Sequence, residues 1–99
     1  MKNSGLIRKL QSLIEKNLYL SKSQIRGKFG QANGYCDNHI WFFKEPSYIR
    51  ILKNEIGFIF EEDIVVDIFI AQYFLGREFR NVFYYEYKDP KYKVYNFLY

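Results

Sequence analysis

The sequence predicts an α+β fold in which two N-terminal helices pack on one face of an antiparallel β-meander of four to six strands. Three observations lead to this prediction. Apolar residues recur at helical spacing before residue 30, and β-branched and aromatic runs dominate after residue 39. The segments between those runs are too short for crossover connections, so neighbouring strands are expected to be antiparallel. The 99 residues suit a single domain, residues 1–99, with one small core.

The two helices are expected at residues 4–17 and 22–29. The second begins with a capping box, in which Ser21 precedes Gln24 by three residues, and it ends at Gly30. The first is amphipathic, because basic and polar residues fill the positions between the members of an apolar stripe. That stripe consists of Leu6, Ile7, Leu10, Leu13 and Ile14.

The strands are expected in four short runs that begin at His39, and in a final hairpin around Asp89 and Pro90. Turn-forming segments such as K-E-P-S, K-N-E and E-E-D separate the runs. Residues 77–87 also fit a helical pattern, but their β-branched and aromatic content favours a strand. The four runs are H-I-W-F-F, Y-I-R-I-L, I-G-F-I-F and I-V-V-D-I-F-I.

The most apolar segment, residues 59–70, holds four of the eleven acidic residues of the chain. Strand alternation sends its side chains to opposite faces of the sheet, while Glu61 and Glu62 fall in or beside a tight turn. One face is expected to receive Ile64, Val66, Ile68 and Ile70, and the other Asp63, Val65, Asp67 and Phe69.

These acids do not have the spacing of a catalytic pair. Asp63 and Asp67 would stand about 13 Å apart along a strand, whereas the two carboxylates of glycosidases lie roughly 5–9.5 Å apart. The segment also lacks the pattern of a calcium-binding loop. We interpret the acids as a guard against aggregation of a neutral strand-forming segment, and as an acidic rim that suits a basic partner.

The loop residues Cys36, Asp37 and His39 are a second candidate for chemistry. A nucleophilic cysteine needs a histidine within hydrogen-bond distance and a third group that orients the histidine. A metal site would need more ligands than one cysteine and one histidine supply. We therefore expect a turn stabilised by Asp37, with no catalytic residue, no metal and no cofactor.

Composition indicates the compartment. One cysteine cannot form an internal disulfide, and the N-terminal residues lack the continuous apolar core of a signal peptide. No apolar run approaches the ~20 residues that span a bilayer. These features predict a cytoplasmic protein with no membrane span.

Charge is distributed unevenly along the chain. Residues 1–53 hold ten Lys or Arg and three acids, a net charge of +7, whereas residues 54–76 hold five acids and no Lys or Arg. The C-terminal segment alternates lysines with tyrosines, as in Y-K-D-P-K-Y-K-V-Y. Such asymmetry steers and orients binding partners.

Residues 20–70 resemble a recurring small-domain layout. L-S-K-S-Q-I-R-G-K-F-G-Q-A-N-G, then a W-F-F strand, then F-I-F-E-E-D-I-V-V-D-I are similar to the small outer-membrane-assembly lipoproteins and to the repeat unit of the β-lactamase inhibitor protein. Small bacterial toxin-immunity proteins share this general character. The resemblance implies a domain that binds proteins and performs no chemistry.

The expected function is therefore binding. We expect a non-catalytic immunity or inhibitor protein that neutralises a cognate bacterial toxin, through aromatic or Arg anchors ringed by charge. The alternative is a small nucleic-acid-binding or regulatory module that uses the basic N-terminal helices and the Tyr/Lys-rich tail. The candidate partner-binding residues are Trp41, Tyr48, Arg50, Asp63, Asp67, Phe69, Tyr92 and Tyr95.

Overall fold

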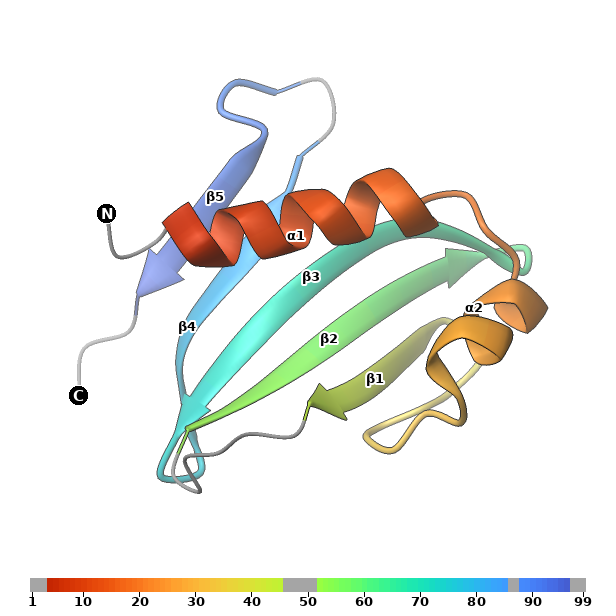
Figure 1. Ribbon diagram of the computed structural model, residues 1–99, viewed down its shortest axis with the longest axis horizontal. Coiled ribbons are helices and arrows are strands. Elements are labelled where there is room, and N and C mark those ends of the chain that lie inside the picture. The colour runs from red at the N-terminus through yellow and green to blue at the C-terminus, as the bar shows by residue number, and fades with distance from the viewer. Residues whose placement is uncertain (1–3, 46–51, 86–87, 97–99) are drawn as a thin grey trace.

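The computed structural model describes residues 4–45, 52–85 and 88–96. Two helices precede a five-stranded antiparallel sheet whose strands lie side by side in chain order (Figure 1). The predicted α+β class and the meander are thereby confirmed. The elements are α1 (Ser4–Asn17), α2 (Lys22–Phe29), β1 (Ile40–Glu45), β2 (Leu52–Glu61), β3 (Ile64–Phe74), β4 (Arg77–Tyr84) and β5 (Tyr92–Asn96).

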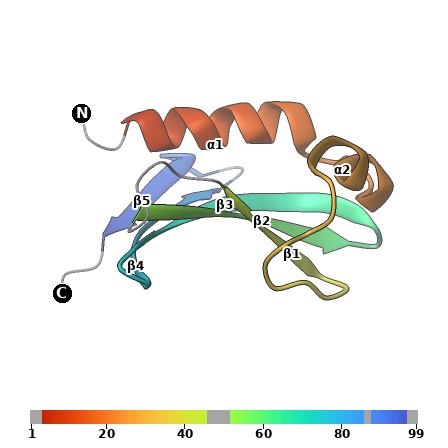
Figure 2. The ribbon, with the colours of Figure 1, turned by 60° about the horizontal axis from the view of Figure 1, so that its bottom comes forward.

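Both helices lie on the same side of the sheet, and no described helix covers the other side (Figure 2). Helix α1 contacts β3, β4 and β5. Helix α2 reaches β1 and β2 through Phe29, whose ring centroid lies 5.8 Å from that of Phe43 and 5.1 Å from that of Phe58. The side chains between the two layers form the core: Leu6, Leu10, Ile14, Ile25, Trp41, Phe43, Ile56, Phe58, Phe60, Val65, Ile68, Ile70 and Val82.

Local sequence signals set the ends of α2. The Ser21 side chain accepts a hydrogen bond from the Gln24 amide, and the Gln24 side chain accepts one from the Ser21 amide, so the predicted capping box is present. Gly30 ends the helix with φ 83°, a left-handed conformation that glycine adopts without strain.

The linker between the helices is fixed on the start of β3. The Tyr19 amide donates to the Val65 carbonyl at 2.8 Å, and the Val65 amide donates to the Leu20 carbonyl at 2.8 Å. The Lys22 amide donates to the Asp63 carbonyl at 3.0 Å. These bonds pair the linker with the part of β3 that β4 does not reach.

A register shift between β2 and β3 corrects one prediction. Val65 was expected on the same face as Asp67 and Phe69, but it is fully buried in the core. The pairing changes from Ile59↔Asp67 to Phe60↔Val65, so β3 carries one extra residue at this point. This bulge turns Val65 toward the helices, whereas Asp67 keeps the predicted face.

The tight turn between β2 and β3 also differs from the prediction. Asp63 was expected on the strand, but Glu62 and Asp63 form the turn itself, with φ values of 50° and 73°. Two consecutive left-handed residues are typical of the two-residue turns that connect twisted antiparallel strands. Residues 77–84 form a strand, as their composition indicated, and the helical alternative for this part of 77–87 is wrong.

The outer edge of β1 is closed by the loop that precedes it. The Gly34 amide donates to the Phe42 carbonyl, and the Phe42 amide donates to the Tyr35 carbonyl. The Asn33 side chain completes this edge, because its Oδ1 accepts from the Lys44 amide at 2.6 Å. Unpaired strand edges invite pairing with other chains, and here the loop satisfies the edge. Within the described ranges, no helix is long and apolar enough to cross a membrane.

Candidate functional site

The sheet face opposite the helices carries a row of aromatic rings, here called the aromatic strip. The strand register aligns Phe42, Gly57, Phe69 and Phe83 across four strands. The ring centroids of Phe42 and Phe69 are 5.5 Å apart, and those of Phe69 and Phe83 are 5.3 Å apart. These are the separations at which aromatic pairs stabilise one another.

Tyrosines extend the strip at both ends. Tyr35, in the loop beside β1, lies 6.5 Å from Phe42 between ring centroids and is 62% exposed. At the other end, Tyr95 lies 5.8 Å from Phe83, and the hydroxyls of Tyr85 and Tyr95 are 3.0 Å apart. The strip thus runs from the loop at one sheet edge to the strand at the other.

Asp67 lies beside this strip on the same face. It is directly opposite Ile59 on β2, and it is two residues from Phe69 on β3. The Asp67 carboxylate is half-buried, and it accepts a hydrogen bond from the Ile68 amide at 2.8 Å. Burial raises the pKa of Asp67, and this hydrogen bond opposes the rise. Within the described residues, no Lys or Arg pairs with it.

A pocket of about 250 Å³ opens on the same face near the β3–β4 turn. Tyr73 lies in this pocket, and burial together with the charge and hydrogen bond of Glu55 raises its pKa to about 12. The phenol is therefore protonated at neutral pH and donates to the Glu55 carboxylate. The pocket is lined by Lys44, Lys53, Glu55, Tyr73 and Gly76.

The structure gathers three of the eight predicted partner-binding residues on this face. Asp67, Phe69 and Tyr95 all belong to the aromatic strip or its border. Asp63 is exposed in the β2–β3 turn, away from the strand positions. Tyr48 and Arg50 lie outside the described residues.

Tyr92 and Trp41 face the helices. Tyr92 contacts Tyr84 in a tilted arrangement, with ring centroids 5.3 Å apart, and packs against the core. Trp41 is only 5% exposed, and its ring lies 4.7 Å from that of Phe60. Arg26 of α2 covers the indole at 5.0 Å from its centroid. In this structure α2 therefore covers Trp41, and the expectation that Trp41 anchors a partner stays a prediction.

The Cys36–His39 segment forms the expected turn. Asp37 Oδ1 accepts hydrogen bonds from the His39 and Ile40 amides at 2.7 and 2.9 Å, and Asp37 Oδ2 accepts one from Tyr35 at 2.8 Å. These bonds lower the pKa of Asp37, the His39 amide most strongly. Among the described residues, no group of three His, Cys, Asp or Glu side chains could hold a metal ion.

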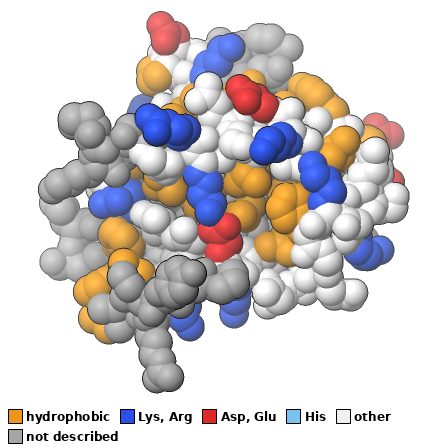
Figure 3. Space-filling view, viewed as in Figure 1, with side chains coloured by type: hydrophobic (Ala, Val, Ile, Leu, Met, Phe, Trp, Pro, Cys, Tyr) orange, Lys and Arg blue, Asp and Glu red, His pale blue; other side chains and the backbone are white. Residues whose placement is uncertain are grey.

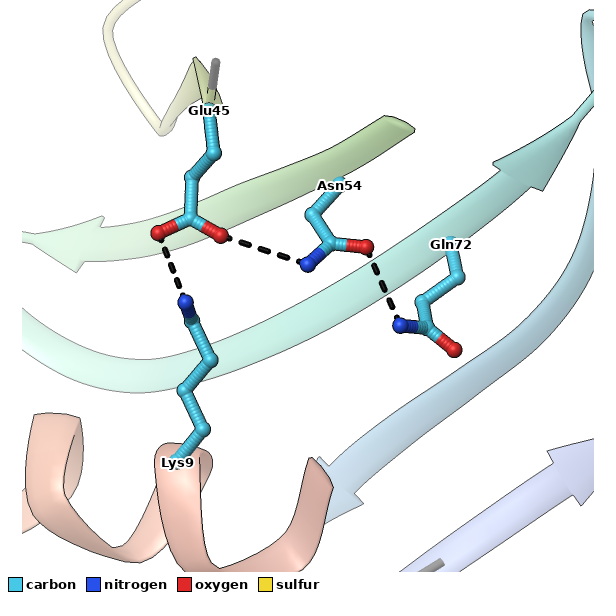
Figure 4. Close-up of polar contacts among 4 residues, drawn as sticks. All are labelled: Lys9, Glu45, Asn54 and Gln72. Atoms are coloured by element: carbon cyan, nitrogen blue, oxygen red, sulfur yellow. Dashed lines mark hydrogen bonds and ion pairs between the residues drawn. The ribbon is translucent and has the colours of Figure 1, made fainter. Parts of the chain in front are cut away.

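A row of polar side chains crosses the helix-covered face beyond the core, here called the polar row (Figure 4). Lys9 of α1 pairs with Glu45 at 2.8 Å. The Asn54 amide donates to Glu45 at 3.3 Å, and the Gln72 amide donates to Asn54 at 3.1 Å.

The polar row continues onto β4 and β5. Arg80 donates to the Gln72 side-chain oxygen at 3.4 Å and to the Asn96 side-chain oxygen at 3.0 Å. Every strand contributes one residue. Asn54 and Gln72 each donate toward Glu45 and accept from the side of Arg80, whereas Asn96 accepts from Arg80. The row therefore links the cation Arg80 on β4 to the anion Glu45 on β1 through two amides.

The helix side of the molecule is basic. Lys and Arg side chains are spread over this side, with few acids among them (Figure 3). Two residues of the Tyr/Lys-rich tail, Lys93 and Tyr95, lie elsewhere, because they are aligned with Phe83 and Asn81 on the opposite face. Lys93 and Tyr95 are thus on the other side of the sheet from the basic helices, whereas Tyr92 is on the same side as the helices.

Sequence reasoning missed four members of the strip: Tyr35, Phe42, Phe83 and Tyr85. Phe42 and Phe83 do carry a signal, since each neighbours a core residue along its strand and alternation sends it to the other face. Tyr35 and Tyr85 lie beyond strand ends and carry no such signal.

Comparisons with protein families, curated proteins and solved structures found no match to this chain.

Proposed function

We propose that this chain is a non-catalytic protein-binding module that docks its partner on the uncovered sheet face. The aromatic strip carries this proposal. A contiguous row of half-buried aromatic rings that ends in the exposed Tyr35 and Tyr95 is typical of an interaction surface, and Tyr and Phe are enriched where proteins meet. In this fold no described element covers it.

Asp67 indicates the chemistry of the partner. A half-buried carboxylate beside Phe69, with no cation near it among the described residues, is suited to an Arg or Lys side chain. An Arg could pair with the carboxylate and stack on the neighbouring ring. The partner is therefore expected to present a basic side chain within an apolar contact surface.

The specific class that we propose is an immunity or inhibitor protein for a bacterial toxin. Its support is the small size of the domain and the resemblance of residues 20–70 to an inhibitor repeat. The proposal is tested with a toxin-like protein encoded by a neighbouring gene, if the two co-purify. Binding is then measured by calorimetry, and protection by growth of cells that express the toxin.

The deciding variant is Asp67→Lys, and its control is Glu15→Lys on the exposed side of α1. Both make the same charge change. We expect Asp67→Lys to weaken binding at least about 30-fold, since it removes a charged contact and introduces repulsion. Glu15→Lys should leave affinity unchanged. Equal affinity of wild type and Asp67→Lys, with folding retained, would reject docking on this face.

The second candidate is nucleic-acid binding by the helix side, favoured by its exposed cations Arg8, Lys16, Arg26 and Lys28. Binding to generic single-stranded RNA that weakens steeply with salt would support it. Absence of binding at low salt would exclude it.

A further inference from the structure

The β4–β5 hairpin forms a second pocket, at the end of the aromatic strip. Its volume is about 240 Å³. Two of its members, Tyr85 and Tyr95, also belong to the strip, so the pocket opens onto the surface proposed for docking. The lining residues are Tyr85, Lys88, Asp89, Pro90, Lys93 and Tyr95.

Each lysine of this pocket lies over a tyrosine ring. Lys88 Nζ is 5.9 Å from the ring centroid of Tyr85, and Lys93 Nζ is 5.6 Å from that of Tyr95. The hydroxyls of these two tyrosines lie 3.0 Å apart. Backbone bonds support the hairpin, because the Tyr85 amide donates to the Lys91 carbonyl at 2.6 Å.

The pocket has more donors than acceptors. Neither lysine pairs with a carboxylate among the described residues. The described lining residues hold two lysines and one acid, Asp89, and so carry a net positive charge. The hydrogen bond between the two phenols raises the pKa of Tyr85. One hydroxyl proton joins the tyrosines and the other remains available to a ligand.

We propose that this pocket binds an oxyanion, supplied as the carboxylate of an acidic side chain of the docked protein. Two ammonium groups and one phenol can each donate to its oxygens, and such charge-assisted bonds are stronger than the cation–ring contacts that the lysines make alone. This inference rests on the proposed function. Together with Asp67, it gives the partner two opposite charges at defined places on one surface.

A protein fits this face better than a nucleic acid does. The carboxylates of Asp67 and Glu55 lie beside the strip, where they would repel a phosphate backbone that followed it. A protein partner that carries both basic and acidic side chains can pair with the charges of both signs on this face. The free phosphate ion shares the chemistry of the carboxylate and serves as a probe of the same pocket.

The test is an NMR titration of the free protein with sodium phosphate and with sodium acetate at constant ionic strength. We expect saturable shifts confined to the signals of Lys88, Lys93, Tyr85 and Tyr95. The double variant Lys88→Met/Lys93→Met should weaken this binding about tenfold or more. The control, Arg8→Met/Lys16→Met on α1, removes the same charge and should leave the titration unchanged.

Saturable binding of either ion, lost only in the pocket variant, supports the site. Shifts that rise linearly or spread over all lysines would overturn it, as would equal binding by both double variants. A single-stranded oligonucleotide that bound this pocket more tightly than either ion would overturn its assignment to an acidic side chain. No partner is needed for these titrations, so their failure is separate from failure of the Asp67→Lys test.

Discussion

The ring of Phe69 lies directly over Gly57, so that a Cβ atom on Gly57 would stand 2.4 Å from Phe69 Cζ. Gly57 is the only position of the row Phe42, Gly57, Phe69, Phe83 without a side chain. Because Gly57 has no side chain, the rings of Phe42 and Phe69 can meet across β2. The aromatic strip therefore depends on a glycine within a strand, where glycine is otherwise unfavourable.

Gly57→Ala is expected to displace Phe69 and to lower the free energy of unfolding by about 1–3 kcal/mol, as overpacking does. Gly27→Ala is the matched control, because a Cβ there meets nothing within 4 Å and the residue is exposed inside α2. That change should raise stability by about 0.5–1 kcal/mol. Urea unfolding measures both. A Gly57→Ala protein as stable as the Gly27→Ala protein would contradict the packing described here.

The helix limits and the strand order could be predicted from the sequence because their causes are local. Hydrophobic period, the Ser21–Gln24 capping box and Gly30 determine α2 without help from the rest of the chain. The face of Val65 could not be predicted in this way. It depends on a bulge opposite Phe60, which shifts the alternation by one residue, and nothing in the local sequence marks it.

Only the part of the candidate site that follows from local strand alternation could be predicted. Asp67 and Phe69 follow from strand alternation, whereas Trp41 and Phe42 are adjacent aromatics that the sequence does not rank. Only the position of α2 decides that Trp41 is covered. The polar row carries still less signal, because residues 45, 54, 72, 80 and 96 are aligned by register alone.

Asp67 is expected to make stability fall as pH rises through the carboxylate range. Its pKa is raised in the folded state, so the folded protein holds this proton more tightly than the unfolded chain does. The stability that Asp67 contributes is fully present below the ordinary carboxyl pKa and is lost as the pH rises through the raised pKa of the folded state. Asp67→Asn should therefore be more stable than wild type at pH 7, and the difference should shrink toward pH 3.

Asp37 supplies the opposite control for this measurement. Hydrogen bonds from the His39 amide, the Tyr35 hydroxyl and the Ile40 amide lower its pKa. Its contribution is present above the ordinary carboxyl pKa and is lost as pH falls through the lowered value. Asp37→Asn should thus be less stable than wild type at pH 7, with a difference that narrows in acid. The same pH trend in both variants would contradict the opposite pKa shifts described for Asp67 and Asp37.

Two buried asparagines are expected to respond in opposite ways to leucine. Asn17 is 2% exposed and satisfied on both sides, because it donates to the Leu13 carbonyl at 3.0 Å and accepts from Lys28 at 2.5 Å. Asn81 is 6% exposed and donates to Glu78 at 2.7 Å, but its Oδ1 has no hydrogen-bond partner.

Asn17→Leu should lower the free energy of unfolding by about 1–3 kcal/mol, because it removes the bond to the Leu13 carbonyl and leaves the Lys28 ammonium with the Lys16 carbonyl alone. Asn81→Leu removes a buried acceptor that is already unpaired, so its stability should be unchanged or higher by up to about 1 kcal/mol. Thermal and urea unfolding compare the two proteins directly. Equal losses would show that the Asn81 oxygen is satisfied in solution.

Removing the side-chain amide at the centre of the polar row is expected to lower the stability of the fold. Gln72→Leu keeps the volume of the side chain, but it leaves the Asn54 oxygen without a donor and Arg80 without one of its two acceptors. Because these groups are partly buried, we expect a loss of about 1–3 kcal/mol in the free energy of unfolding. The control is Gln11→Leu on the exposed side of α1, which should stay within about 0.5 kcal/mol of wild type. A Gln72→Leu protein as stable as this control would mean that water satisfies the row and that its alignment across the five strands contributes little to the fold.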